Sequence, residues 1–275
     1  MIKKIRMVFG ALLLIILLIC MFLYFMQDKM IFFPQPLHQQ TLSLIRDTYP
    51  EAVEKNLEMQ DGPKLHGWFV NESKPEEKPG LIFFFGGNAE EVSHMIERVR
   101  HYEGWATVLI NYRGYGKSEG RPGEKKLNSD ALEVYDHFSS RDDIDPEKIV
   151  IMGRSLGTGV ATHLAYHRQN RGLILISPFT SILSLAQRMF PVLPVKWLLR
   201  HPFNSLEKAP HIRTPLFVIL GSEDQIVAPK ESEKLARHWA GPATVKVIEG
   251  EDHNTLSANP LFEEYVKKSL STLTD

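Results

Sequence analysis

Cysteine is nearly absent from this sequence, and so is any excess of charge. Among 275 residues there is one cysteine, Cys20, so an intramolecular disulfide is excluded. No histidines and cysteines cluster at the spacing of zinc ligands, so we expect no structural metal site. The formal net charge of −1 gives no reason to expect nucleic acid as a partner. An apolar fraction of 43% and a charged fraction of 24% indicate a globular protein rather than a disordered one.

Charge is missing altogether from residues 7–26, a run of 20 residues with the sequence MVFGALLLIILLICMFLYFM. At about 1.5 Å rise per residue, a helix of this length spans roughly 30 Å, which matches the hydrocarbon core of a bilayer. Lys3, Lys4 and Arg6 precede the run. The positive-inside rule then places residues 1–6 in the cytosol and the rest of the chain on the far side. We therefore predict a single-pass transmembrane helix at residues 7–26.

Three other interpretations of this run fit the sequence less well. A cleaved signal peptide has an apolar core of about 7–15 residues that ends in small residues, whereas bulky ones occupy positions 20–24 here. Lipoprotein cleavage at Cys20 needs a small residue just before it, and Ile19 stands there. A helix that is apolar on every side is difficult to bury in a domain of this size.

After the apolar run, residues 27–50 form a connecting arm and residues 51–275 a single domain. Phe32 and Phe33 in the arm could lie at the bilayer interface or pack on the domain. Short apolar runs then alternate with helical patterns, which predicts an α/β fold: a mostly parallel sheet of about eight strands, with helices on both faces and an antiparallel edge made by the first two strands. The expected strands are 53–58, 65–70, 81–85, 106–111, 148–152, 173–177, 216–220 and 245–248, and the expected helices are 89–103, 124–140, 157–168, 229–239 and 260–273.

One stretch interrupts this alternation, at about residues 178–214. It contains an apolar segment broken by prolines at 189–195, followed by Trp197, Leu198 and Leu199. The stretch is too long for a simple connection, so we predict a short lid insertion. Its apolar residues could bind an acyl chain, or they could simply cover part of the core.

A serine stands between two glycines directly after the expected strand 148–152 and before the expected helix 157–168. In Gly153-Arg154-Ser155-Leu156-Gly157, the glycines permit a sharp turn that exposes the serine hydroxyl at the carboxyl end of the sheet. The following helix offers free backbone N–H groups to a developing anion. A glycine-rich turn with an incidental serine is the plain alternative, but the strand–turn–helix context favours Ser155 as a nucleophile.

A serine hydroxyl needs a base, and the base needs an orienting acid. The expected strand 216–220 is followed by Asp224, and the expected strand 245–248 by His253. Both loops lie at the carboxyl ends of buried strands, in the chain order Ser…Asp…His. The sequence therefore predicts a catalytic triad of Ser155, Asp224 and His253, with Glu223 as the substitute acid. We interpret the other histidines as surface or structural groups.

Two backbone N–H groups are candidates for an oxyanion hole. One belongs to Leu156, the residue after the serine. The other belongs to Asn88, in the loop 86–89 after the expected strand 81–85, where two glycines let the backbone approach a substrate closely. An ordinary strand-to-helix turn would have the same composition, so this assignment depends on the geometry of the loop.

With these motifs in place, the chain resembles the α/β-hydrolase superfamily over roughly residues 50–275. It is similar to small membrane-anchored α/β-hydrolase-domain proteins, which include protein depalmitoylases. Relatives usually have His-Gly-Asn where this chain has Gly86-Gly87-Asn88, so a side chain expected to stiffen that loop is missing. The motifs that carry the resemblance are GGNAE at 86–90, NYRGYGKSEGRP at 111–122, GRSLGTG at 153–159, GSEDQIVAP at 221–229 and GEDHN at 250–254.

The sequence thus predicts a membrane-anchored serine hydrolase that acts by two-step acyl transfer, without cofactor or metal. The expected substrate is an ester or thioester of an apolar acid, in a small molecule, a lipid or a lipidated protein near the bilayer. A peptidase or amidase of the same fold and C–C bond cleavage are alternatives within enzymes. A catalytically silent binding protein is the alternative from another class, because fold does not imply function.

Overall fold

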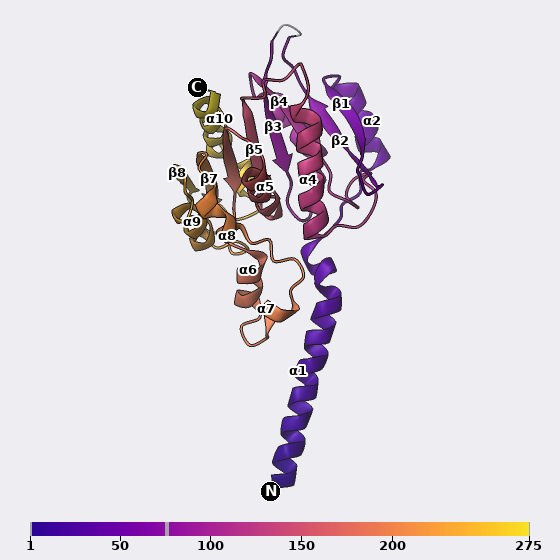
Figure 1. The fold of residues 1–275 in the computed structure, drawn as a ribbon, viewed down its shortest axis with the longest axis vertical. Coiled ribbons are helices and arrows are strands. Elements are labelled where there is room, and N and C mark those ends of the chain that lie inside the picture. Colours follow the sequence, from indigo (N-terminus) through magenta and orange to yellow (C-terminus); the bar gives the residue numbers. More distant parts are fainter. Residues whose placement is uncertain (1, 75–76, 275) are drawn as a thin grey trace.

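The computed structural model describes residues 2–74 and 77–274. A twisted eight-stranded sheet forms its centre, with strand order β1-β2-β4-β3-β5-β6-β7-β8 (Figure 1). β1 pairs antiparallel with β2, β2 pairs antiparallel with β4, and all further pairs are parallel. The predicted mostly parallel α/β architecture is therefore confirmed. The strands are β1 Ala52–Glu58, β2 Lys64–Val70, β3 Gly80–Phe85, β4 Trp105–Ile110, β5 Ile149–Arg154, β6 Gly172–Ile176, β7 Leu216–Gly221 and β8 Ala243–Ile248.

The central strands are largely apolar, as suits a sheet with helices on both faces. Every residue of β3, β4 and β6 is buried, as expected of parallel strands that lie between two helical layers. One layer of the core packs under α4, α5 and α9, and the other under α2, α3 and α10. The main covering helices are α2 Gln39–Thr48, α3 Ile96–Val99, α4 Glu124–Ser139, α5 Leu156–His167, α9 Pro229–Arg237 and α10 Pro260–Thr274.

The helix predicted over 89–103 is wrong in extent. Only a short 3-10 turn, η1 Val92–Met95, and the single turn of α3 form there. Glu90 turns inward and accepts a hydrogen bond from the Gly87 N–H, while Glu91 caps η1 by accepting from the Ser93 N–H. These side-chain bonds compete with helix formation at the start of the segment. The turn at its other end includes Gly104 with φ +77°.

The N-terminal helix α1 is longer than the predicted span and covers Ile2–Ile31. It projects from one end of the domain (Figure 1), and most of its apolar side chains are exposed. Of the two phenylalanines that follow it, Phe32 is buried in the core, whereas Phe33 is largely exposed. The segment predicted as an arm also contains α2, whose Leu42 and Ile45 are buried. The three-residue spacing of these two side chains is the sequence signal for this helix.

The stretch predicted as a lid has two parts. Residues 182–199 form a hairpin of α6 Ile182–Met189 and α7 Val195–Leu198 that projects alongside α1 (Figure 1). We call these residues the α6–α7 hairpin, and neither of its helices contains a buried residue. The remainder, with α8 Ser205–Lys208 and η2 Ala209–His211, packs on the core through Phe203 and Ile212.

A buried ion pair stabilises the loop that follows β4. The Arg113 guanidinium donates to both carboxylate oxygens of Asp130, at 2.8 and 2.5 Å, and two further bonds at 2.6 and 2.7 Å reach Asp61. Arg113 is 3% exposed and Asp130 5%. The loss of one partner of a buried pair leaves a charge without compensation, which is far more costly than the loss of a surface pair.

We expect Asp130→Ala to lower the free energy of unfolding by about 3 kcal/mol, because the buried Arg113 would keep only Asp61 as a partner. Asp143→Ala is the matched control, since Asp143 pairs with Arg141 at the surface, and we expect it to cost about 1 kcal/mol or less. Thermal unfolding of the full chain in detergent measures both. Equal losses in the two variants would contradict this assignment.

Candidate active site

Ser155 lies on the sharp turn that joins β5 to α5. Its backbone has φ 49° and ψ −117°, a region that non-glycine residues occupy only when the surrounding structure holds them there. The flanking glycines leave no space for a side chain. A Cβ on Gly153 would lie 2.5 Å from the carbonyl oxygen of Gly157, and a Cβ on Gly157 would lie 2.0 Å from that of Phe85. The turn therefore requires glycine on both sides of the serine.

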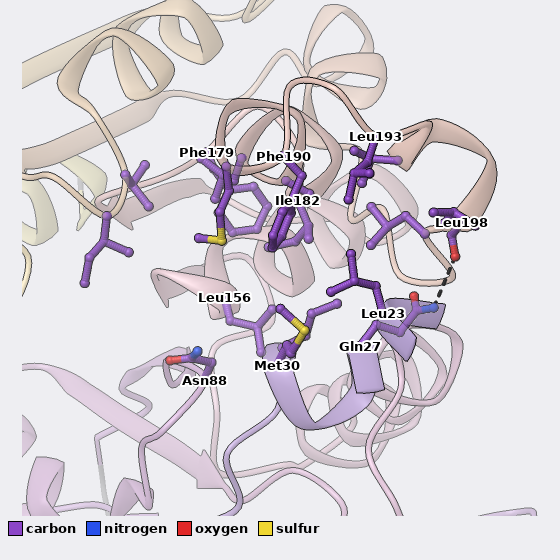
Figure 2. A pocket seen from close by; sticks show the side chains of 18 of the residues that line it. Leu23, Gln27, Met30, Asn88, Leu156, Phe179, Ile182, Phe190, Leu193 and Leu198 are labelled. Atoms are coloured by element: carbon purple, nitrogen blue, oxygen red, sulfur yellow. Dashed lines mark hydrogen bonds between the residues drawn. The ribbon is translucent and has the colours of Figure 1, made fainter. Parts of the chain in front are cut away.

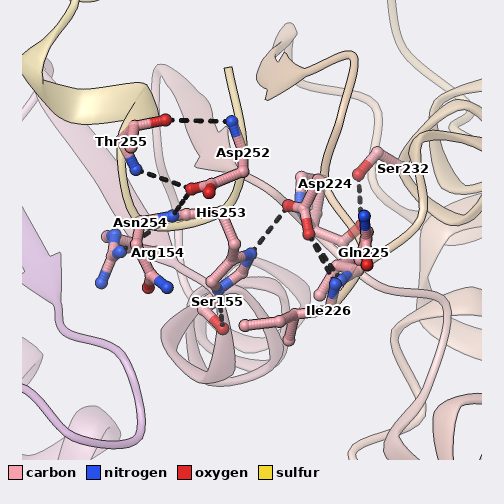
Figure 3. A network of polar contacts seen from close by, with 12 residues as sticks. Arg154, Ser155, Asp224, Gln225, Ile226, Ser232, Asp252, His253, Asn254 and Thr255 are labelled. Atoms are coloured by element: carbon pink, nitrogen blue, oxygen red, sulfur yellow. Dashed lines mark hydrogen bonds and ion pairs between the residues drawn. The ribbon is translucent and has the colours of Figure 1, made fainter. Parts of the chain in front are cut away.

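The structure brings Ser155, His253 and Asp224 into one hydrogen-bonded line (Figure 3). His253 Nε2 lies 2.9 Å from Ser155 Oγ, and His253 Nδ1 lies 2.7 Å from Asp224 Oδ2. Each residue comes from a different loop, after β5, β8 and β7 respectively. With Nδ1 protonated toward the carboxylate, Nε2 is free to accept the serine proton. This is the geometry that a serine nucleophile and its base require.

Asp224 is held as a carboxylate within the fold. Burial alone opposes ionisation, but the hydrogen bond and charge of His253, together with the Val227 N–H, hold the pKa of Asp224 below its usual value. Its other oxygen, Oδ1, accepts from the N–H groups of Ile226 and Val227 at 3.0 and 2.8 Å. Glu223, the substitute acid in the sequence analysis, is exposed, and Asp224 is the acid that contacts His253.

Two backbone N–H groups are available beside the serine hydroxyl. Leu156 is the first residue of α5, so no carbonyl within the helix accepts its N–H. Asn88 lies on the loop after β3, and it borders the same cavity as Ser155 and Leu156 (Figure 2). Within the described residues, the Asn88 N–H has no backbone acceptor. Both predicted donors thus belong to residues that border the cavity of Ser155, and neither N–H has a backbone acceptor within the described residues.

The loop 86–88 is stabilised by side chains that the sequence analysis did not single out. The Tyr112 hydroxyl donates to the carbonyl of Gly86 at 2.9 Å, and the Tyr115 hydroxyl donates to that of Asn88 at 2.6 Å. Glu90 accepts from the Gly87 N–H at 2.5 Å. The two tyrosines belong to the NYRGYG segment at 111–116, which was the available signal.

Glu90 connects this loop to the serine turn. Arg154 Nη1 lies 3.3 Å from Glu90 Oε2, and Arg154 Nη2 donates to the carbonyl of His253 at 3.1 Å. Burial by itself would raise the pKa of Glu90, but the His94 hydrogen bond, the Arg154 charge and the Gly87 N–H hold it below its usual value. At neutral pH, Glu90 therefore joins the two loops as a charged acceptor.

A cavity of about 200 Å³ extends from Ser155 toward the N-terminal helix (Figure 2). Its surface is almost entirely apolar, and the polar exceptions are Gln27, Asn88 and Ser155. Within residues 2–74 and 77–274, no three His, Cys, Asp or Glu side chains are grouped so as to hold a metal ion. The remaining lining residues are Leu23, Met30, Ile31, Leu156, Phe179, Ile182, Leu185, Ala186, Met189, Phe190, Leu193, Val195, Leu198, Leu199, Ile226 and Val227.

The sequence of this chain is similar to a family model and to several known proteins. The family model Hydrolase_4, described as "Serine aminopeptidase, S33", matches residues 77–207. The uncharacterised protein Rv2307c of Mycobacterium tuberculosis is 34% identical over 238 residues, which cover 86% of this chain and 83% of that protein. The alpha/beta hydrolase domain-containing protein WAV2 of Arabidopsis thaliana is 34% identical over 193 residues, covering 63% of this chain and 62% of that protein.

Solved structures share the same fold. The Pyrococcus furiosus esterase PF2001 superposes with a TM-score of 0.65 over 88% of this chain and 96% of that chain, at 19% identity. At this identity, the likeness to solved structures shows the fold alone. The family match is a sequence match, and it supports a hydrolase of the serine type. The eight-stranded sheet and these relatives together show that the chain belongs to the α/β-hydrolase superfamily.

Proposed function

We propose that this protein is a membrane-anchored serine hydrolase that cleaves carboxylic esters or thioesters of apolar acids. The observation that carries the proposal is the hydrogen-bonded line Ser155–His253–Asp224, which opens onto an apolar cavity. A serine beside a base and a buried acid supplies the nucleophile, and the cavity supplies a surface for an acyl chain.

In the proposed mechanism His253 accepts the Ser155 hydroxyl proton as the oxygen attacks the ester or thioester carbonyl. The ionised Asp224 holds the ring in the required tautomer and stabilises the imidazolium that forms. The N–H groups of Leu156 and Asn88 donate to the oxyanion of the tetrahedral intermediate. His253 then protonates the leaving alcohol or thiol. Water, deprotonated by His253, releases the acid from the serine and restores the free enzyme.

A peptidase is the second candidate, because the matching family model is described as an aminopeptidase. An aminopeptidase must bind the free α-amino group of its substrate, and a carboxylate would be the matching side chain. None of the described residues that line the cavity is acidic. A cavity lining without a carboxylate favours an ester or thioester over a peptide.

Product analysis separates hydrolysis of these bonds from C–C bond cleavage. A folded protein that hydrolyses none of them would support the alternative of a catalytically silent binding protein.

We further propose that α1 is a membrane anchor, with the N-terminus in the cytosol and the hydrolase domain on the other side. The helix is long and apolar enough to cross a bilayer, and only 6% of its most apolar stretch is buried. An exposed apolar surface of this size is unfavourable in water. This placement would bring the Ser155 cavity to the bilayer surface, near membrane lipids and lipidated proteins.

The full chain in detergent should react with a fluorophosphonate probe, and Ser155→Ala should abolish the labelling. Because the nucleophile is lost, the same variant should lower ester hydrolysis by roughly 10⁶-fold. Ser129→Ala, at an exposed position, is the matched control and should label as the wild type does. In-gel fluorescence and hydrolysis of a short-chain nitrophenyl ester measure both effects. Labelling that persists in Ser155→Ala, or a folded wild type that does not react, would rule out the assignment.

Glu90→Gln should lower kcat by roughly tenfold or more while KM changes little. The loop that carries Asn88 would lose its charged acceptor, and an oxyanion donor contributes mainly in the transition state, where one donor is worth about 10²–10³ in rate. Glu97→Gln is the control on the same segment, where the carboxylate is exposed. Steady-state kinetics on a short ester provide both constants. A rise in KM with an unaltered kcat would show that Glu90 does not act through the oxyanion loop.

Replacing two residues in the middle of α1 with lysine, as Leu14→Lys with Leu17→Lys, should release the chain from membranes. Each charge costs about 2.5–3.5 kcal/mol at the centre of a spanning helix. Ser129→Lys with Ser271→Lys adds the same charge to the domain surface and should leave the chain in the alkali-washed membrane fraction. A C-terminal reporter enzyme that is active only outside the cytosol should be active in the wild type. Activity of a cytosolic reporter at that end would reverse the proposed topology.

A further inference from the structure

The cavity beside Ser155 is not formed by the hydrolase domain alone. Four residues of α1 line it, at positions 23, 27, 30 and 31, opposite the α6–α7 hairpin (Figure 2). Their spacing of i, i+4, i+7 and i+8 places them on one face of the helix. At about 1.5 Å rise per residue, roughly 12 Å of α1 borders the cavity. Phe22 and Phe25 face away, and they are 63% and 66% exposed.

We propose that α1 is part of the acyl-binding site as well as the membrane anchor, so that its cavity-facing residues determine which acyl chains Ser155 can process. The acyl chain would enter from the bilayer, between α1 and the α6–α7 hairpin. This inference rests on the proposed function, in which Ser155 attacks the acyl carbonyl. It adds a specificity-determining element that lies outside the hydrolase fold.

Polar contacts attach α1 to the α6–α7 hairpin and to the two residues that directly follow it. Gln27, which is 6% exposed, donates to the carbonyl of Leu198 at 3.1 Å and accepts from the Arg200 N–H at 2.7 Å. In the next position of the helix, Asp28 pairs with Arg200 at 2.6 Å and with His201 at 3.0 Å. A polar side chain at the end of an apolar helix is stable where protein groups satisfy it. These bonds hold the cavity-facing side of α1 against the hairpin.

The cavity is bordered by Ser155 and by four residues of α1, from Leu23 to Ile31. In Figure 2, Asn88 and Leu156 lie on one side of the cavity and Leu198 on the other, with Met30 and Leu23 between them. Leu23 lies nearer than Met30 to the uninterrupted apolar part of α1, where the bilayer core is expected. An acyl chain whose carbonyl is at Ser155 would therefore lie with its tail toward the bilayer.

The α6–α7 hairpin carries three apolar side chains that are mostly exposed. Met189, Val192 and Trp197 are 69%, 89% and 82% exposed. Gln27 attaches the hairpin to α1, so these residues would lie at the surface of the bilayer that α1 is proposed to cross. Tryptophan is enriched at the membrane–water interfaces of membrane proteins. The mouth of the cavity between α1 and the hairpin would then open into lipid.

Leu23→Trp in the full chain should shift the chain-length preference of the enzyme, because the larger side chain would fill the far end of the cavity. We expect the ratio of kcat/KM for a nitrophenyl palmitate to that for a nitrophenyl butyrate to fall by roughly tenfold, since several methylenes would lose their apolar contacts. Met30→Trp, nearer the serine, should lower the ratio at least as much. The measurement uses protein reconstituted in phosphatidylcholine vesicles.

Matched controls place the same substitutions on the lipid-facing side of α1. Leu17→Trp and Met21→Trp change exposed residues that do not line the cavity, so the ratio should remain that of the wild type. A wild-type ratio in both cavity variants, in protein that the fluorophosphonate probe still labels, would overturn the inference. Equal falls in cavity and control variants would overturn it as well, because they would indicate a general effect on the helix.

A second experiment uses the wild-type chain, so its result does not depend on whether a variant folds. A long-chain alkyl fluorophosphonate with a photoreactive group at the end of the chain would first attach to Ser155, and illumination would then cross-link its tail. Cross-links within residues 20–31 are expected. Attachment to Ser155 with cross-links only elsewhere would overturn the role of α1 and leave the proposed hydrolase standing. No attachment to Ser155 would refute the proposed function, and this inference with it.

Discussion

Gly157 lies against the carbonyl oxygen of Phe85, and the arrangement of the site depends on this close contact. A Cβ at that position would lie 2.0 Å from the oxygen, so the start of α5 can approach the end of β3 only with glycine there. The contact brings the Leu156 N–H and the loop 86–88 to the side of the Ser155 hydroxyl. The loops with Asp224 and His253 reach the same place because β5, β7 and β8 are parallel and end at one edge of the sheet.

The loop 86–88 beside this turn is held by hydrogen bonds from neighbouring side chains, because its two glycines have no side chains. A Cβ on Gly86 would lie 3.2 Å from Val92 and 3.4 Å from Glu90, so these side chains occupy the space beside it. Glu90, Tyr112 and Tyr115 supply hydrogen bonds to the loop backbone. Buried polar groups of this kind stabilise one conformation when every partner is present. The network therefore stabilises the loop although Gly86 carries no side chain.

The same carbonyl of Asn88 that accepts from Tyr115 also accepts from the Phe33 N–H at 2.9 Å. The chain that leaves α1 is thus bonded directly to the candidate oxyanion loop. Together with Gln27, Asp28 and the buried Phe32, this bond makes the N-terminal segment a structural part of the site. These contacts hold the end of α1 beside the cavity that it borders.

The sequence alone indicated the strands, the mostly parallel sheet and the three loops that carry Ser155, Asp224 and His253. Strands buried on both faces are largely apolar, and parallel strands end at one edge, so the local pattern was sufficient. The local pattern was insufficient at residues 89–103, where Glu90 forms tertiary hydrogen bonds. It was also insufficient in the connecting arm, residues 27–50, where the helix α2 was not predicted. Only the tertiary structure decided that α1 borders the cavity. Gln27 and Leu198 are 171 residues apart, and an apolar helix has the same sequence pattern whether its side chains contact lipid or protein.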